Sequence, residues 1–102
     1  SEYNVVANCV VLDCDATAIM ANGPINRIIG NYIQAAGTYG VDITDAGDNT
    51  VVIGNIIEGT GGDVIEINAT GEDCVVVSNR LDGAVDDNSG TSVVDHNDTT
   101  AF

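Results

Sequence analysis

The sequence is almost without basic residues. Two arginines and no lysine stand against sixteen Asp and Glu residues, and the formal net charge is −14 at pH 7. Nucleic acid is therefore not an expected partner, because the chain has almost nothing that neutralises phosphates. An anionic membrane surface would repel the chain in the same way. No apolar run approaches the roughly eighteen residues of a membrane span, so we expect no membrane insertion.

Aromatic residues are also scarce, at 4% of the chain, although hydrophobic residues make up 44%. A core must therefore be built from Val and Ile, whose branching at Cβ favours strands. The chain has 102 residues, a length that suits one domain, and we expect this domain to span residues 1–102.

The three cysteines do not form a zinc-binding pattern. An odd number leaves at least one thiol free or paired between chains, and the spacing matches no zinc site. We interpret Cys74 as a small buried hydrophobic residue. Cys9 and Cys14 are close enough along the chain for a local disulfide, and free thiols are the alternative.

A phrase of seven residues recurs along the chain. Its clearest copy is residues 51–57, VVIGNII in one-letter code, and related phrases occupy residues 4–10, 27–33, 75–81 and 93–99. The repeated asparagines are Asn8, Asn31, Asn55, Asn79 and Asn97, with spacings of 23, 24, 24 and 18 residues. A fixed period in this range is typical of repeat architectures.

Counting from each asparagine predicts which side chains face the core. Alternation along a strand predicts that the residues two before and two after each asparagine point inward, as the asparagine does. These residues are Val6, Ile29, Ile53, Val77 and Asp95, and Val10, Ile33, Ile57, Leu81 and Thr99. A second inward strand in each full coil contains Ala18 and Met20, Val41 and Ile43, and Ile65 and Ile67.

Short strands separated by Gly and Asn turns, with no helical period between them, leave no room for a βαβ unit. The sequence therefore predicts an all-β, single-stranded parallel β-helix of about four to five coils, stacked at the ~4.8 Å strand spacing. The repeated asparagines would stack as a ladder at one corner. Hydrogen bonds along this ladder would satisfy buried amides that otherwise cost about 1–3 kcal/mol each.

The repeat resembles that of the right-handed parallel β-helix superfamily, which includes pectate lyases, polygalacturonases and phage tailspikes. The resemblance lies in the phrase apolar-x-Gly-Asn-x-apolar, followed by a Gly turn and Gly-apolar-acidic-apolar, and it covers residues 4–99. It implies a right-handed coil. It implies no particular activity, because the superfamily hosts many functions.

One apolar stripe suggests an interface. Three positions before each asparagine stand Val5, Ile28, Val52, Val76 and Val94. Alternation aims this stripe outward, and a contiguous exposed apolar patch usually marks an interaction surface. We expect copies of the chain to associate there, as a homotrimer like the tailspikes that it resembles. Coverage by another segment of the same chain is the alternative.

The carboxylates suggest cation sites. Asp42 and Glu66 should stack one coil apart, and a shared Ca²⁺ or Mg²⁺ would relieve their repulsion. Two further candidate clusters lie in turns: Asp45, Asp48, Glu72 and Asp73, and Asp82, Asp86, Asp87 and Asn88. A solvated acidic face is the simpler interpretation of each group, and we expect no other cofactor.

The residues of known β-helix enzymes are not matched. A lyase of the pectate type would need a basic residue beside a cation site, and only Arg27 and Arg80 exist. The polygalacturonase pattern is missing, because His96 lies in Asp-His-Asn-Asp and there is no lysine. A glycosidase needs only two carboxylates at the right separation and stays open. The balance favours a protein that is not an enzyme.

Sugar binding without catalysis is a further hypothesis. Tyr32 and Tyr39 are the mid-chain aromatics, and their rings could stack on sugar faces. Packing of Tyr32 at a subunit contact is the alternative. Polysaccharide is therefore one candidate partner.

The composition resembles that of proteins from salt-loving archaea and their viruses, although an acidic extracellular protein is the alternative. We therefore expect a structural or adhesive module on a virion surface, extracellular, bound to itself and to other virion or surface proteins. The alternative is a carbohydrate-binding or carbohydrate-active β-helix of a cell envelope.

Overall fold

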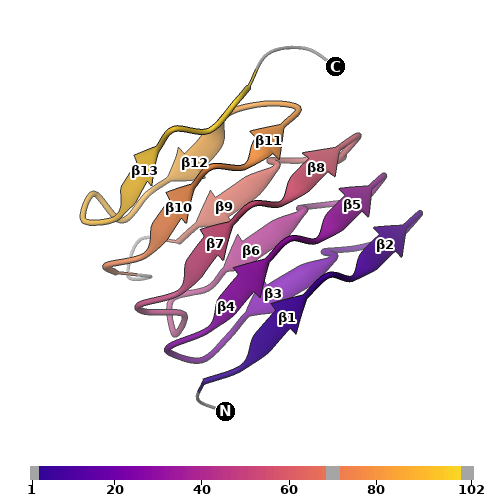
Figure 1. Cartoon of the computed structure of the whole chain (residues 1–102). Coiled ribbons are helices and arrows are strands. Elements are labelled where there is room, and N and C mark those ends of the chain that lie inside the picture. The colour runs from indigo at the N-terminus through magenta and orange to yellow at the C-terminus, as the bar shows by residue number, and fades with distance from the viewer. Residues whose placement is uncertain (1–2, 69–71, 100–102) are drawn as a thin grey trace.

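The chain forms a parallel β-solenoid. The computed structural model describes residues 3–68 and 72–99. These residues form three parallel sheets that wind through about four turns, and the strands of neighbouring coils pair in parallel (Figure 1). The predicted all-β parallel β-helix is therefore confirmed.

Each sheet takes one strand from each coil. Sheet A contains β1 (Val5–Ala7), β4 (Arg27–Ile29), β7 (Val51–Ile53), β10 (Val75–Val77) and β13 (Val93–Asp95). Sheet B contains β2 (Val10–Leu12), β5 (Tyr32–Gln34), β8 (Ile56–Glu58) and β11 (Arg80–Leu81). Sheet C contains β3 (Ile19–Ala21), β6 (Val41–Ile43), β9 (Ile65–Ile67) and β12 (Val85–Asp87).

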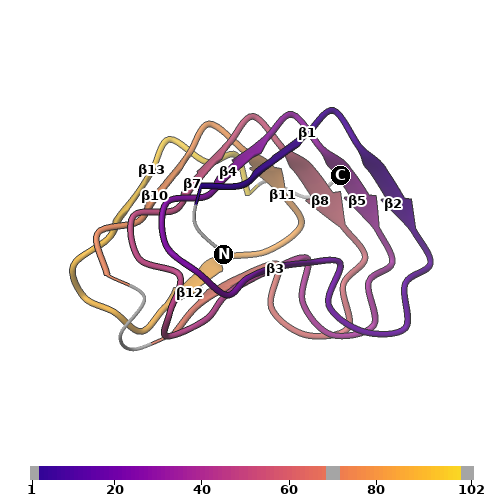
Figure 2. The same ribbon diagram turned by 90° about the horizontal axis from the view of Figure 1, so that it is seen from below.

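The coil is right-handed. Viewed from the N-terminal end, the chain passes clockwise through β1, β2 and β3 while it moves away from the viewer (Figure 2). A right-handed connection between parallel strands is the hand that strand twist favours. The handedness that the family resemblance implied is thus present in the structure.

The core is a stack of aliphatic side chains from all three sheets. Its members from the middle coils are almost fully buried, and they are Ile28, Ile33, Val41, Ile43, Val52, Ile57, Ile65, Ile67, Val76 and Leu81. Stacked coils place like residues above one another, so the core is a set of Val and Ile columns. Branched side chains fit these columns because their χ1 freedom is already small.

The asparagine ladder is confirmed for Asn31, Asn55 and Asn79. The N–H and Nδ2 of Asn55 both donate to Oδ1 of Asn79, each over 2.9 Å, and Asn31 donates to Asn55 over 2.8 and 3.0 Å. Each amide also reaches the preceding coil, as Asn55 Nδ2 does at the Ile28 carbonyl (2.9 Å). Asn97 extends the ladder, since its Oδ1 accepts from Asn79 over 3.1 and 2.9 Å.

The prediction that Asn8 belongs to this ladder is wrong. The Cys9 N–H, not that of Asn8, donates to Oδ1 of Asn31 over 2.9 Å, so Cys9 occupies the ladder position of the first coil. Asn8 has φ 56° and instead supplies the left-handed residue at the corner. Asparagine adopts this conformation more readily than most residues, and so the first-coil asparagine has a different role from the others.

The left-handed corner residue also shifts the alternation of side chains. Every sheet A strand is followed by one such residue, and these are Asn8, Gly30, Gly54, Ser78 and His96. The residue bends the chain from one sheet into the next, and the nearest inward positions before and after it are three residues apart. Ile28 and Asn31 are such a pair, and both are buried. Simple period-two counting across the corner is therefore off by one.

The predicted interface stripe is consequently wrong. Ile28, Val52 and Val76 are 1%, 0% and 0% exposed and belong to the core. The inward column of sheet A pairs Val6, Ile28, Val52, Val76 and Val94 in register. The predicted inward column of Ile29, Ile53 and Val77 is partly exposed and faces outward.

In the other two sheets the first coil was misplaced because the count began at Asn8, one residue before the true ladder position at Cys9. In sheet B, Ile33, Ile57 and Leu81 are buried as predicted, but Val11 aligns with them and Val10 is exposed. In sheet C, the pairs from residues 41–43 and 65–67 are confirmed. Their first-coil partners are Ile19 and Ala21, in place of Ala18 and Met20.

A second polar stack, which the sequence analysis missed, lies at the corner before sheet A. The residues that precede its strands are Asn4, Asn26, Thr50, Cys74 and Ser92. Nδ2 of Asn4 donates to Oδ1 of Asn26 (3.2 Å), Nδ2 of Asn26 donates to Oγ1 of Thr50 (3.3 Å), and the Cys74 N–H donates to Oγ of Ser92 (3.1 Å). The sequence signal that could have revealed this stack is a small polar residue directly before each strand of sheet A.

Candidate functional surfaces

The outer face of sheet A is apolar over its whole height. Its two outward columns contain Val5, Arg27, Val51, Val75 and Val93, and Ala7, Ile29, Ile53, Val77 and Asp95. Eight of these ten positions are aliphatic, and the two charged residues have opposite signs. Because the chain carries a net charge of −14, a sheet face with no net charge is unusual for it. We call this surface the sheet A face.

The apolar surface continues around the asparagine corner onto sheet B. There, Val10, Tyr32, Ile56 and Arg80 form one outward column. Val10 and Ile56 are exposed, and the Arg80 guanidinium is held by Asp98, with Nη1 2.8 Å from Oδ2. Of the predicted stripe, only Val5 belongs to this outward apolar surface.

Sheet C has the opposite character and carries an acidic column. Met20, Asp42, Glu66 and Asp86 face outward in register, so the predicted stacking of Asp42 on Glu66 is confirmed. The Asp42 Oδ1 accepts a hydrogen bond from Asn68 Nδ2 over 3.0 Å. This contact partly offsets the effect of burial, which raises the pKa of Asp42.

Glu66 is the centre of a three-carboxylate cluster. One oxygen each from Asp63, Glu66 and Asp86 lies within 4.8 Å of the others; we call this group the acidic cluster. Asp63 comes from the turn before β9, and Asp86 comes from the next coil. Three carboxylates at this spacing fit a hard divalent cation such as Ca²⁺. The register of the coils brings Asp86 to Glu66, whereas Asp63 is only three residues from Glu66 in the sequence.

One carboxyl group of the acidic cluster has a shifted pKa. Desolvation, and then a hydrogen bond and repulsion from Asp86, raise the pKa of Asp63. The Tyr39 hydroxyl adjoins the cluster: a hydrogen bond to Glu66, and then the negative charge of Glu66, raise the pKa of Tyr39 to about 12. Tyr39 thus remains a protonated hydrogen-bond donor to Glu66 at neutral pH.

The two predicted turn clusters do not assemble into sites. Among the described residues, the acidic cluster is the one group of carboxylates that meets this spacing, and Asp45, Asp48, Glu72 and Asp73 do not join it. The Asp48 Oδ1 instead accepts the Glu72 N–H over 3.0 Å.

The second turn group divides between several partners. The Asp82 Oδ2 accepts the Gly59 N–H (3.4 Å), and the Asp87 Oδ1 accepts the Ser89 hydroxyl (2.6 Å). The Asn88 Nδ2 donates to Oε1 of Glu66 (3.2 Å). Of this predicted group, only Asp86 enters the acidic cluster.

The two tyrosines are not a common sugar platform. Tyr32 faces outward on sheet B and donates its hydroxyl to Oε1 of Glu58 over 2.8 Å, a contact that raises its pKa. Tyr39 lies beyond β5 and interacts with Glu66 of sheet C. The two rings therefore contact carboxylates on different sheets, and each remains a separate candidate for ligand contact.

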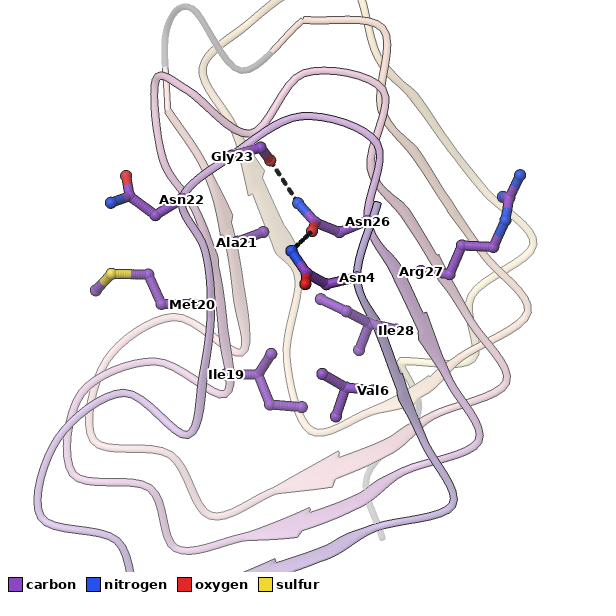
Figure 3. A pocket seen from close by; sticks show the side chains of 10 residues that line it. All are labelled: Asn4, Val6, Ile19, Met20, Ala21, Asn22, Gly23, Asn26, Arg27 and Ile28. Carbon is purple, nitrogen blue, oxygen red and sulfur yellow. Dashed lines mark hydrogen bonds between the residues drawn. The ribbon is translucent and has the colours of Figure 1, made fainter. Parts of the chain in front are cut away.

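The first coil ends in an open pocket of about 290 Å³. Val6, Ile19 and Ile28 point into it from sheets A and C, with Asn4 and Asn26 beside them, whereas Met20 and Arg27 point away (Figure 3). The pocket is the N-terminal mouth of the solenoid core. Its apolar floor is the core itself.

The cysteines are free thiols. Cys9 is exposed, Cys14 is partly exposed and Cys74 is buried, which agrees with the interpretation of Cys74 as a core residue. Burial raises the pKa of the Cys74 thiol. The alternative of a Cys9–Cys14 disulfide is not realised in the structure.

None of the described residues forms a helix that is long and apolar enough to cross a membrane. In comparisons with protein-family models, with curated proteins and with solved structures, nothing matches the chain.

Proposed function

We propose that this chain is a non-enzymatic structural or adhesive module that associates side by side with copies of itself. The observation that supports the proposal is the sheet A face, which is aliphatic at eight of ten outward positions in a chain of net charge −14. Contact through any acidic surface would bring like charges together. The sheet A face is the side surface on which copies can meet without that repulsion.

The setting that we propose is the surface of a virus particle from a high-salt host. The absence of lysine and the excess of Asp and Glu support it, because concentrated salt shortens the Debye length to about 3 Å at 1 M and removes most self-repulsion. The resemblance of the repeat to tailspike-like members of the right-handed β-helix superfamily supports the same setting and a homotrimer. Other virion or surface proteins are the remaining expected partners.

Solution mass is the direct test of self-association. Light scattering in multi-molar KCl should give a mass of three chains or a multiple of it, and the mass should fall in dilute buffer as the screening is lost. In salt, Ile53→Asp should reduce the assembly to smaller species while the fold is retained, because Ile53 is an outward residue of sheet A. Gln34→Asp is the control, since it introduces the same charged side chain at an exposed outward position of sheet B that lies outside the apolar column of that sheet.

Three other results would contradict part or all of this proposal. If Ile53→Asp leaves the mass unchanged, the sheet A face is not the association surface. A folded monomer in both salt conditions would reject self-assembly. Specific binding of an acidic polysaccharide, lost on changing Tyr32 or Tyr39 to Ala, would then favour the carbohydrate-binding module of a cell envelope.

A further inference from the structure

The first coil carries apolar side chains where the later coils carry polar ones. On sheet B, Leu12 occupies the outward column of Gln34 and Glu58. On sheet C, Met20 occupies the column of Asp42, Glu66 and Asp86. Leu12 is 52% exposed and Met20 is 56% exposed. The change in residue type is therefore specific to this coil.

The exposed apolar residues concentrate at this end. Nine large hydrophobic residues are exposed in the described part of the chain, and six of them lie between residues 3 and 25. These six are Tyr3, Val5, Val10, Leu12, Met20 and Ile25. They lie in the first coil and in the turns on either side of it, at the same end of the solenoid as the open mouth of the core seen in Figure 3. We call the six residues and the mouth the apolar end.

Charge is distributed unevenly along the solenoid axis. Residues 3–25 contain two ionisable carboxylates, those of Asp13 and Asp15, for a net charge of −2. Residues 72–99 contain seven Asp and Glu and one Arg, for a net charge of 1 − 7 = −6 with His neutral. Two apolar ends can meet with far less repulsion than an apolar end and the opposite end.

The asparagine ladder has a direction, and this direction also favours contact between two apolar ends over head-to-tail stacking. Each ladder side chain reaches toward the coil before it, as Asn31 does when its Oδ1 accepts the Cys9 N–H and its Nδ2 donates to the Val6 carbonyl. In head-to-tail stacking, Cys9 of the next copy would stand where the Asn97 N–H requires an amide oxygen. A thiol is a weak acceptor, so the ladder does not continue across such a joint.

From these observations, together with the self-association of the proposed function on which it rests, we infer that the apolar end is a second interface and that its partner is the apolar end of another copy. The Cα extents are 29 × 25 × 20 Å, and five stacked strands at ~4.8 Å account for the shortest one. The two longer extents then define the cross-section of the end. Taken as an ellipse, this cross-section covers roughly 550 Å² per copy, or roughly 1,100 Å² in total, close to the ~1,000 Å² that a specific interface needs.

Variants of the apolar end test the contact without disturbing the fold. Leu12→Glu and Met20→Asp each install a residue type that the same column carries in later coils, at Glu58 and Asp42. Each should halve the assembly mass measured by light scattering in multi-molar KCl, while circular dichroism stays unchanged. Ile56→Asp, on the same sheet as Leu12 but two coils away, should leave this contact intact.

The dependence of the assembly mass on protein concentration tests whether two apolar ends meet or copies stack head to tail. An end-to-end pair of apolar ends is closed, so its mass should reach a plateau at twice that of the side-by-side assembly. Head-to-tail stacking would grow without a plateau and would overturn the inference. An unchanged mass in both Leu12→Glu and Met20→Asp would overturn it as well, whereas an unchanged mass in Ile53→Asp bears only on the sheet A face.

Discussion

The central asparagine of the ladder offers the sharpest test of how this solenoid is held together. Asn55 is fully buried. Its Oδ1 accepts the N–H and the Nδ2 of Asn31 (2.8 and 3.0 Å), and its Nδ2 donates to the Ile28 carbonyl and to Oδ1 of Asn79 (2.9 Å each). We predict that Asn55→Ala lowers the free energy of unfolding substantially.

The magnitude follows from the partners that the alanine leaves behind. The buried N–H of Asn31 loses its amide oxygen, and two side-chain hydrogen bonds along the ladder disappear. An orphaned buried donor costs roughly 1–3 kcal/mol and each net hydrogen bond contributes roughly 0.5–1.5 kcal/mol, so the expected loss is roughly 2–6 kcal/mol. That is a large fraction of the ~5–15 kcal/mol that stabilises a typical domain.

Urea unfolding at fixed high salt, followed by circular dichroism, measures this loss. Asn8→Gly is the matched control, because Asn8 repeats the sequence pattern but lies outside the ladder, at φ 56°. Glycine adopts that conformation without strain, so its effect should stay within about 0.5 kcal/mol. Equal effects of the two variants, or a loss below about 1 kcal/mol for Asn55→Ala, would refute the argument.

Four other predictions concern strain, charge and salt. Ile25 is β-branched at φ 60°, so Ile25→Gly should raise the free energy of unfolding by about 1 kcal/mol, whereas Ile56→Gly within a strand should lower it; urea titration tests both. The raised pKa of Asp63 means that stability falls as pH rises above the ordinary carboxyl range, and Asp63→Asn should flatten this decline in a melting-temperature series; an equally steep decline would contradict it. The Tyr39 hydrogen bond should be intact below pH 10.0 and lost as pH rises through about 12, which the ultraviolet absorbance of tyrosinate should show as a late step that Tyr39→Phe removes. Raising KCl from about 0.01 M to 1 M shortens the Debye length from about 30 Å to 3 Å and should raise the unfolding midpoint; an unchanged midpoint would show that self-repulsion does not limit stability.

The acidic cluster could be predicted only in part. The stacking of Asp42 on Glu66 follows from a repeat of 24 residues, because that period fixes which residues of adjacent coils are neighbours. Asp63 lies in the turn three residues before Glu66, whereas Asp86 comes from a shortened coil, where the period gives no register. The approach of Asp86 to the other two carboxylates therefore required the path of the chain in space.

The amino-acid sequence by itself determined the parallel solenoid, its strands and most of its ladder. The reason is that a repeated Val and Ile triplet with a following asparagine encodes both strand propensity and the stacking of like on like. The tertiary structure alone decided which side of sheet A faces the core, because a left-handed residue at each corner shifts the alternation by one. It therefore placed Val52 inside and Ile53 outside, and it put Cys9 where the sequence pattern had suggested Asn8.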